Sequence, residues 1–437
     1  MIQTTTALSA PPTVAKMGPR AGLSALKALG GGFGGILPIL ETVQREVGDV
    51  FQITLPGFRP VFVAHPDIMR QVLVDDRDAY LWRPADDPVA RLLRHGLLVT
   101  DGQEHADLRT VMDPSSHRKH FVSRCESIWQ ESDRILDTWQ PDASVDMLVE
   151  MRKLALIIFE QVYFSHDLGP ELETIWRHML KALAYIGPGL WVVKGAGAPP
   201  AEVAVLDEHL HALIRQRRVD PIPPDDLLTH LVQSLDDDDL VRDQMMTMLI
   251  AGHDTSTALL AWTLYLLGQH PQWMAQAQAE IRDVLGEQPP TPQNVGGLAV
   301  LDQVVKESLR LYPPIHVGNR FAAQDVELAG YHIPAGTRVM VSYYLVQRHP
   351  DFWEAPAEFR PERWAGGFRP APFSYLPFGG GPRNCIGGAF AQLEARLVLA
   401  RILQRFDLTG HGRKARAHMG ATLEPHPGVP MRARRQA

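Results

Sequence analysis

The chain has 437 residues, of which 45% are hydrophobic, so it can bury a large core and fold as a globular protein. Its formal net charge of -7 gives no general attraction to a phosphate backbone, which argues against nucleic acid as a partner. Its two cysteines, Cys125 and Cys385, exclude a disulfide framework and favour a reducing, cytoplasmic location.

The first 44 residues predict a flexible or surface-lying lead-in. Their most apolar stretch, 21–40, contains a lysine, a proline and six glycines. It therefore does not match the roughly 20 strongly apolar residues of a membrane-spanning helix, and it lacks the form of a signal peptide. We expect no transmembrane helix. Because no internal repeat or long linker follows, we expect one folded domain over residues 45–437.

The rest of the chain predicts a mainly helical fold with a minor β-sheet region. An alternating apolar pattern predicts a hairpin over 50–64 that turns at Pro56-Gly57, and a helix over 67–74 follows it. Small strands are expected over 326–337, around a turn at 333–336. Helical spacing is found at 126–138, 145–165, 171–186, 202–218, 225–235, 240–269, 271–285, 298–312 and 387–405.

The predicted helix over 240–269 is the longest, and beyond Met245 it is apolar on nearly all sides. Such a helix should run through the protein interior. Its middle, 251–257, nevertheless contains a glycine and several polar groups, although a buried charge is costly without a partner. One interpretation is a kink with hydroxyls bonded back to the preceding turn. The other is a groove where a ligand lies against the helix and needs a proton source.

Cys385 follows the glycine-rich loop 378–384 and precedes the predicted helix 387–405. A helix N-terminus and free loop amides stabilise a thiolate. The glycines permit a flat ligand to approach the backbone closely, and Arg383 offers a cation two residues away. The alternative is a cysteine that acts as a small buried hydrophobic residue.

Five positions around this cysteine match the haem-binding loop of the cytochrome P-450 family, Phe-x-x-Gly-x-(Arg/His)-x-Cys-x-Gly: Phe378, Gly381, Arg383, Cys385 and Gly387. The chain therefore resembles this family, and the resemblance implies the cytochrome P-450 fold with a single haem-containing domain. It also implies that Cys385 is the axial thiolate ligand of the haem iron. Phe378 would pack near the sulfur, and Arg383 would reach a haem propionate.

The family's Glu-x-x-Arg helix has a counterpart in Glu307 and Arg310, although such a pair alone is common on helix surfaces. The segment 361–364 resembles the family's Pro-Glu-Arg-Phe segment, with Trp364 in place of the usual Phe. The resemblance implies that Arg363 joins Glu307 and Arg310 in a charge cluster that locks the fold.

Residues 251–256 resemble the family's Ala/Gly-Gly-x-Asp/Glu-Thr-Thr/Ser segment. The resemblance implies that Ala251 and Gly252 border the haem and that Gly252 opens room for dioxygen on the iron. Thr255 would hydrogen-bond the oxygen ligand, and Asp254 would relay protons.

Further cations match positions that bind the haem propionates in this family. His105 and Arg109 stand four residues apart in an early predicted helix, and Arg320 precedes the expected strands. Two acidic propionates need cationic partners, so these assignments agree with one another. The implied cofactor is haem b, iron protoporphyrin IX, with O2 as co-substrate.

The resemblance implies a monooxygenase that inserts one oxygen atom from O2 into a lipophilic small molecule, because a thiolate ligand favours cleavage of the O–O bond. One alternative is an H2O2-dependent peroxygenase, but such enzymes tend to lack an acid-alcohol pair like Asp254-Thr255. The other is a non-enzymatic haem sensor or carrier, which needs no such pair.

Electrons are expected from a separate ferredoxin or flavodoxin with its reductase, because no flavin or iron–sulfur segment is visible. The basic run 117–120 is a candidate docking site for such a partner, and a solvated basic turn is an equal alternative.

Substrate-lining segments are expected at 80–98, 186–200, 248–255, 314–317 and 419–423. These are largely apolar, so the substrate should be lipophilic. Several segments resemble soluble bacterial carotenoid and fatty-acid hydroxylases. We therefore expect hydroxylation of a terpenoid or carotenoid, with a fatty acid as the alternative. The protein is expected to be a cytoplasmic monomer, peripheral to the membrane if its substrate is a membrane lipid.

Overall fold

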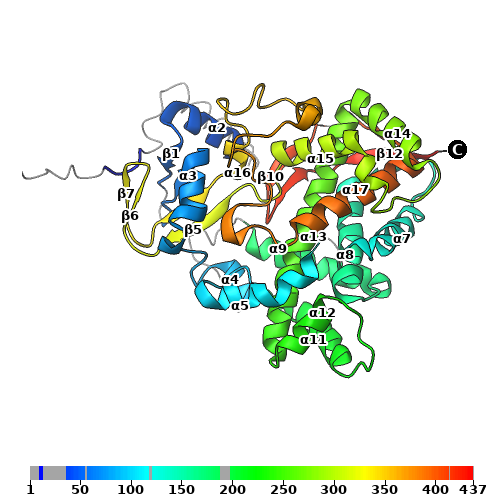
Figure 1. Cartoon of the computed structure of the whole chain (residues 1–437), viewed down its shortest axis with the longest axis horizontal. Helices are drawn as coiled ribbons and strands as arrows, with labels where there is room; N and C mark the ends of the chain where they lie inside the picture. The colour runs from blue at the N-terminus through cyan, green and yellow to red at the C-terminus, as the bar shows by residue number, and fades with distance from the viewer. Residues whose placement is uncertain are drawn as a thin grey trace, which may run out of the picture.

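The computed structural model describes residues 9–12, 36–54, 57–117, 121–187, 197–412 and 414–436. The helices fill one side of the molecule, and a five-stranded sheet lies on the other (Figure 1). The predicted fold class, mainly helical with a minor sheet, is confirmed.

Each of the nine helices predicted from residue spacing is present, with ends within two residues of the prediction. The predicted helix over 67–74 is split into α3 and a π-helical segment over Gln71–Asp75. The α-helices are α2 (Ile36–Val47), α3 (Pro66–Arg70), α4 (Pro88–Leu93), α5 (Gly102–Met112), α7 (Cys125–Leu136), α8 (Met147–Phe164), α9 (Leu172–Ile186), α11 (Val203–Arg218), α12 (Leu227–Ser234), α13 (Asp238–Gln269), α14 (Pro271–Leu285), α15 (Ala299–Leu311), α16 (Tyr343–Val346) and α17 (Gly388–Arg405).

The main sheet has the strand order β1-β2-β8-β5-β3, in which β2 and β8 are parallel and the other neighbours antiparallel. The predicted hairpin over 50–64 is confirmed as β1 and β2, although residue 56 of its turn lies outside the described residues. The strands of this sheet are β1 (Val50–Gln52), β2 (Val61–Val63), β3 (Tyr80–Leu81), β5 (Gly318–Ala322) and β8 (Arg338–Val341).

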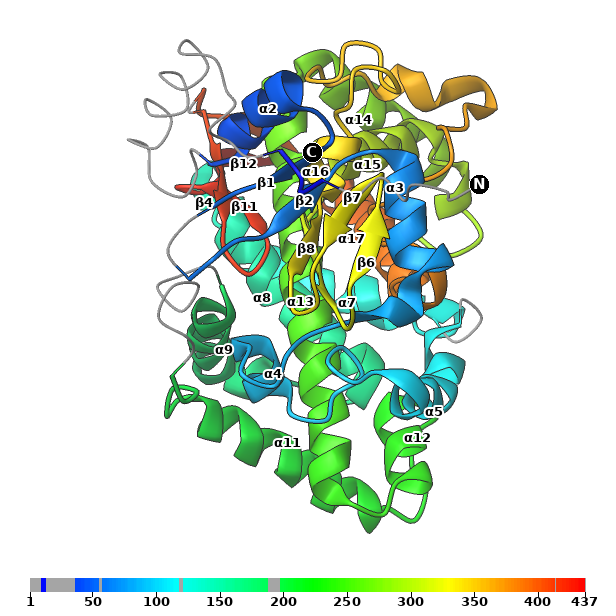
Figure 2. The ribbon, with the colours of Figure 1, turned by 90° about the vertical axis from the view of Figure 1, so that its left-hand side faces the viewer.

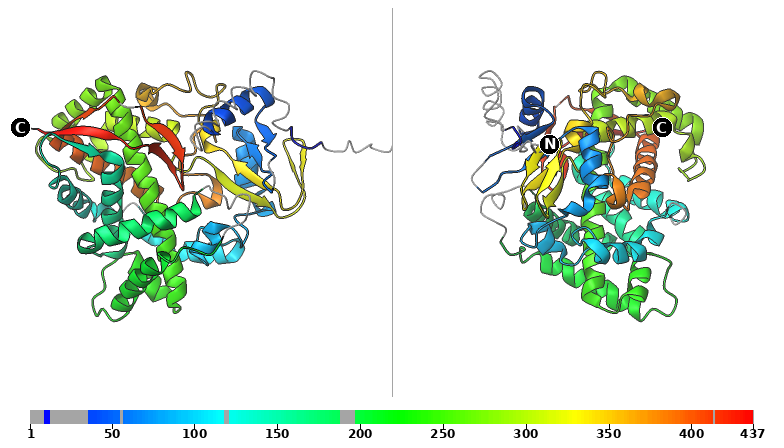
Figure 3. Two further views of the ribbon diagram at one scale, coloured as in Figure 1. Left: turned by 180° about the vertical axis from the view of Figure 1, so that it is seen from behind. Right: turned by 60° about the vertical axis from the view of Figure 1, so that its left-hand side comes forward.

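Three smaller sheets complete the described strands. Seen from behind, the C-terminal strands, coloured red, run across the helical part toward the main sheet (Figure 3). The smaller sheets pair β4 (Ala143–Asp146) and β9 (Phe406–Gly410) with β12 (Pro430–Arg435), β10 (Arg416–Met419) with β11 (Leu423–His426), and β6 (Val326–Leu328) with β7 (Tyr331–Ile333).

The turn predicted at 333–336 does not join the two strands of the β6–β7 hairpin. That hairpin turns at Ala329 and Gly330, which both have positive φ, at 51° and 79°. Positive φ at both central residues suits the twist of a two-residue hairpin. The predicted turn joins β7 to β8 instead and is confirmed there, because the Thr337 N–H donates to the Pro334 carbonyl at 3.1 Å between the two strands.

The predicted boundary of the N-terminal lead-in, at residue 44, falls inside α2 and is corrected here. Leu37, Leu40 and Val43 lie on one face of α2 and are buried against Phe51 and Leu345. This spacing of three residues places them on the same side of the helix, toward the core. Apart from residues 9–12, the earlier part of the predicted lead-in lies outside the described residues.

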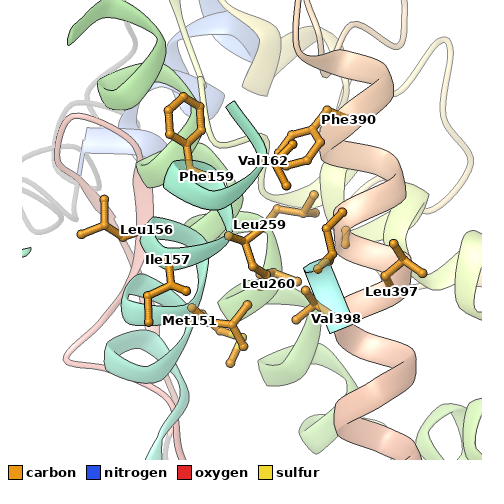
Figure 4. Packing of buried hydrophobic residues seen from close by; sticks show 14 of the residues in the cluster. Met151, Leu156, Ile157, Phe159, Val162, Leu259, Leu260, Phe390, Leu397 and Val398 are labelled. Carbon is orange, nitrogen blue, oxygen red and sulfur yellow. The ribbon is translucent and has the colours of Figure 1, made fainter. Parts of the chain in front are cut away.

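The long helix α13 runs through the length of the molecule (Figure 2). It packs between α8 and α17, where Met151 and Ile157 of α8, Leu259 and Leu260 of α13 and Val398 of α17 belong to one buried cluster (Figure 4). Within the described part of the chain, we find no helix with the length and apolar character of a membrane span.

Candidate active site

One face in the middle of α13 is open to space inside the molecule. Between Val241 and Leu264 every residue is buried except Ala251, Gly252 and Thr255, which are partly accessible. Residues 251 and 255 lie one turn apart on the same side of the helix. The open face of α13 is therefore the face that carries Thr255.

The polar groups in this part of α13 do not break the helix, which is continuous from Asp238 to Gln269. The Thr255 hydroxyl donates to the Ala251 carbonyl at 2.7 Å, and Thr257 donates to the His253 carbonyl at 2.9 Å. The hydroxyls thus bond back to the preceding turn, as one sequence interpretation predicted, but without interrupting the helix. A hydroxyl that donates in this way can still accept a hydrogen bond through its lone pairs.

Gly252 faces α8 in a way that the sequence did not predict. A Cβ at this position would lie 2.6 Å from the ring carbons of Phe159, which is fully buried in α8. The space left by the missing side chain is therefore filled by an aromatic ring. The contact between the two helices therefore requires glycine here, and the role of opening room for dioxygen stays a prediction.

Asp254 is buried and accepts a hydrogen bond from the Thr422 hydroxyl at 2.7 Å. Burial, together with the negative charge of Glu424, raises the pKa of Asp254 to about 7, and Thr422 and Arg152 oppose the shift. A carboxyl group with a pKa near neutrality can both donate and accept a proton at working pH. The carboxyl group faces Thr422, and no hydrogen bond within the described residues joins it to Thr255.

Cys385 is an exposed residue that lies shortly before the start of α17. Its N–H donates to the Phe378 carbonyl at 2.8 Å, which closes the glycine-rich loop just before α17. Burial among protein atoms raises the pKa of its thiol, whereas the Gly387 N–H and Arg109 lower it. Cys385 is thus solvent-accessible, and yet protein atoms desolvate its thiol. This combination indicates a residue in the wall of a cavity rather than on the outer surface.

Phe378 packs at the start of α17, next to the cysteine. A Cβ on Gly388 would lie 3.3 Å from the Phe378 ring, so this glycine allows the ring to lie against the helix. The contact agrees with the expectation that Phe378 packs beside the residue that carries the sulfur.

Arg320 and Arg383 meet at the indole ring of Trp82. Their guanidinium carbons lie 3.8 Å and 4.9 Å from the ring centroid. Arg383 pairs with Asp101 at 2.7 Å. Arg320 is 6% exposed, and the only hydrogen bond found for it in the described chain goes to the Asn319 carbonyl. Burial lowers the pKa of Arg320 to about 10, with a contribution from Arg383.

His105 lies among these cations on α5. Burial, together with the positive charges of Arg383 and Arg109, lowers its pKa to about 4. Arg109 itself donates to Asp113 at 2.6 Å and to the Asn384 carbonyl at 2.9 Å. It therefore ties α5 to the residue before Cys385, and its role in binding a propionate stays a prediction.

Trp82 carries no sequence signal of its own. It joins the site because β3 pairs with β5, which brings Leu81 opposite Phe321 and so places residue 82 near Arg320. Pairing between strands this far apart in the sequence cannot be predicted from local pattern.

The charge cluster behind the site is confirmed as a contact. Glu307 is buried and accepts from Arg310 at 2.7 Å and from Arg363 at 3.0 Å. The indole N–H of Trp364 donates to the same carboxylate at 2.9 Å. The Trp that replaces the family's usual Phe thus adds a hydrogen bond that the motif itself does not predict.

The segments expected to line the substrate pocket come together around α13. The Leu97 N–H donates to Gln244 at 2.8 Å, and Thr422 holds Asp254. The Leu423 N–H donates to the Pro314 carbonyl at 2.8 Å. At the end of α9, a Cβ on Gly187 would lie 3.3 Å from the Ala421 nitrogen. Residues 188–196 of one segment and 118–120 of the basic run lie outside the described residues.

The sequence model of the family described as Cytochrome P450 matches residues 27–427. The chain belongs to the cytochrome P450 family. Cyclooctatin synthase of Streptomyces melanosporofaciens is 30% identical over 88% of this chain and 87% of its own. Cyclooctat-9-en-7-ol 5-monooxygenase of the same organism is 30% identical over 83% of each chain. The crystal structure of the cytochrome P450DA heme domain has a TM-score of 0.84 at 26% identity and covers 99% of each chain.

The protein is accordingly a cytochrome P450 monooxygenase. Membership of this family implies a haem-thiolate centre, the use of O2 and electron donors outside the chain. The residues around Cys385 fit a haem, because Arg320 is a buried cation without a carboxylate partner among the described residues. Such a cation is costly unless an anion compensates it, and a haem propionate supplies that charge.

Proposed function

We propose that this cytochrome P450 hydroxylates a terpenoid, with Cys385 as the axial ligand of haem b. The observation that carries the proposal is the accessible Cys385 sulfur beside buried cations, together with a long helix whose open face carries Thr255 next to Asp254. When bound, the haem supplies activated oxygen for insertion into a C–H bond. All of these residues lie in one folded domain over 45–437, extended at its start by α2.

Thr255 and Asp254 have different roles in proton transfer. The Thr255 hydroxyl is held by the Ala251 carbonyl and accepts through its free lone pairs on the open face of α13. Asp254 stands behind it, buried and bonded to Thr422, with a pKa near neutrality. Glu424 is the next carboxylate, and it is partly accessible and paired with Arg152. Protons would enter past Glu424 and pass through Asp254.

Arg320, Arg383 and His105 bind the haem carboxylates in this proposal. Arg320 and Arg383 approach from opposite parts of the chain, β5 and the loop before Cys385, and both contact Trp82. Arg109, the fourth cation predicted to bind the haem carboxylates, also positions the cysteine loop through the Asn384 carbonyl. Two arginines with fixed planar donors suit two carboxylates.

The substrate proposal rests on the relatives and on the apolar segments around α13. Cyclooctatin synthase and cyclooctat-9-en-7-ol 5-monooxygenase belong to terpenoid-related chemistry. In this chain, the segments 248–250 and 419–423, which adjoin Ala251 and the Asp254–Thr422 contact, consist mainly of apolar residues. Walls of this kind bind lipophilic ligands and use few polar contacts.

We further propose that a separate ferredoxin or flavodoxin, with its reductase, supplies the electrons. The two described cysteines are both free, as is usual in the reducing cytoplasm. We therefore propose a cytoplasmic protein, and we propose that it is a monomer.

The test combines spectroscopy with turnover of the haem-loaded enzyme. The ferrous carbon monoxide complex should show a thiolate-type Soret band, and a band at the histidine-haem position would overturn the assignment of Cys385. Spin-state titrations should respond to a cyclic terpenoid alcohol more strongly than to a long-chain fatty acid. With NADPH, ferredoxin and reductase, the terpenoid alcohol should gain one oxygen atom. A response confined to the fatty acid would contradict the terpenoid proposal.

A further inference from the structure

A second cluster of potential ligands lies on α8, away from the cysteine loop. Glu160 near the end of α8, His166 just after it and His209 of α11 each offer one atom, and these atoms lie within 4.8 Å of one another. Glu160 is fully buried and His209 is 9% exposed. The cluster links the end of α8 to α11, and α9 packs against both helices.

Two atoms of this cluster lack partners. The Glu160 carboxylate receives His209 Nε2 at 3.2 Å on Oε1, but its Oε2 has no hydrogen-bond partner within the described residues. The same is true of His166 Nε2, which is also buried. Leaving a buried polar atom unsatisfied costs about 1–3 kcal/mol. Two such atoms in one group of potential ligands indicate that a further binding partner belongs between them.

A second carboxylate stands behind His209. Glu171 Oε2 lies 3.4 Å from His209 Nδ1, on the opposite side of the ring from Glu160. While Nε2 donates to Glu160 it carries a proton, and a metal ion would displace that proton, so that Nε2 binds the ion and Nδ1–H donates to Glu171. This is the usual outer-shell arrangement of a histidine that binds a metal.

The cluster is also accessible from outside. A hollow of about 590 Å³ opens beside it, and His166, Glu171 and His209 are among its lining residues. The hollow gives an ion a way in and leaves room for a water ligand.

We propose that Glu160, His166 and His209 bind one Zn²⁺, with water in the fourth position. Two imidazole nitrogens and one carboxylate are a common zinc set, at about 2.0–2.2 Å from the metal. To bind one ion, the donor atoms must move closer together. His166 can move because it lies beyond the end of α8 at Phe164. The ion would join α8 to α11 and replace the direct bond between Glu160 and His209.

The test measures zinc in the tag-free, haem-loaded enzyme after equilibrium dialysis against zinc chloride. Zinc per haem iron, determined by inductively coupled plasma mass spectrometry, should reach one. His166→Ala should weaken zinc binding at least tenfold, and it leaves the Glu160–His209 contact in place, so the variant should fold. Glu171→Gln should weaken binding by about 10–100-fold without changing the stoichiometry.

The matched control is His178→Ala, which removes a half-buried histidine of α9 whose hydrogen bond among the described residues is to the Thr174 carbonyl. It should bind zinc like the unaltered enzyme. In parallel, zinc should raise the melting temperature of the unaltered enzyme and of His178→Ala, but not that of His166→Ala. Equal zinc content in His166→Ala and the unaltered enzyme, or no zinc in the unaltered enzyme, would overturn the proposal.

Discussion

Asp254 illustrates how burial prepares a residue for proton transfer. An exposed aspartate is ionised at neutral pH, but desolvation of Asp254 and the nearby charge of Glu424 keep its proton until about pH 7. The adjacent Thr255 lies on the open face of α13, whereas Asp254 lies on a buried face of the same helix.

We expect Asp254→Asn to lower the turnover rate about 100-fold, the lower end of the effect of a general acid. The proton-donating form predominates below about pH 7 and is lost above it. Turnover of the unaltered enzyme should therefore fall as the pH rises through 7, and Asp254→Asn should lack this decline. Steady-state turnover between pH 6 and 8.5 checks the prediction. An unchanged decline in the variant would assign it to another group.

Thr255→Ala should uncouple oxygen consumption from product formation. The variant removes the hydroxyl that the Ala251 carbonyl holds on the open face, but leaves Asp254 and Thr422 in contact. We expect NADPH consumption to continue while hydrogen peroxide replaces most of the product. Thr255→Ser keeps the hydroxyl and should restore coupling. Peroxide and product are measured against NADPH consumed, and unchanged coupling in Thr255→Ala would contradict the role.

At the scale of elements, the contact of α8 with α13 depends on Gly252. The Phe159 ring occupies the place of a Cβ, so the two helices approach more closely than an alanine would permit. Gly252 therefore looks like part of a ligand groove in the sequence, while in the fold it is a packing residue.

We predict that Gly252→Ala destabilises the enzyme by about 1–3 kcal/mol through overpacking, partly offset by about 1 kcal/mol of helix propensity. Phe159→Leu in the same chain should make the added methyl group less costly, because it removes the ring that the methyl meets. A double-mutant cycle from urea unfolding of the haem-loaded enzyme measures this coupling. Strictly additive effects would show that the ring is not the cause.

The charge cluster that joins Glu307 and Arg310 of α15 to Arg363 should be the group of ion pairs whose loss destabilises the protein most. Glu307→Gln leaves buried Arg310 and its neighbour Arg363 without their counter-charge, and we expect a loss of about 3–5 kcal/mol. Trp364→Phe restores the residue usual in the family but removes one hydrogen bond to a carboxylate, at about 1.5–3 kcal/mol. Urea unfolding ranks the two variants, and a larger loss for Trp364→Phe would contradict the argument.

At the scale of the whole molecule, the haem should hold together segments from distant parts of the chain. Arg320 comes from β5, His105 from α5 and Arg383 from the cysteine loop, and burial lowers the pKa of all three, with a smaller contribution from the charge of Arg383 at Arg320 and His105. Without an anion to compensate these cations, the contacts between the three segments should be less stable.

Removing the haem should therefore speed hydrogen exchange in α5 and in residues 378–387, while α14, which bears none of these residues, should keep its protection. Exchange followed by mass spectrometry on the haem-loaded and haem-free chains checks this. Equal protection of α5 in both forms would contradict the cation assignments.

The sequence by itself determined the helices, because the spacing of apolar residues is local information that burial of one helix face then reinforces. It also determined the cysteine loop and the Glu307–Arg310–Arg363 contact, since these lie in short motifs that resemble a known family. It did not determine α2, whose apolar face emerges from a glycine-rich stretch and finds its partners in β1 and around Leu345.

Only the tertiary structure decided which side each site residue faces. Trp82 reaches Arg320 through strand pairing, Gly252 meets Phe159 through helix packing, and Arg109 turns to the Asn384 carbonyl. The physical reason is the same in each case: the partner lies far away in the sequence, and its approach depends on how whole elements pack. The zinc cluster was likewise invisible in the sequence, because its ligands do not form a local motif.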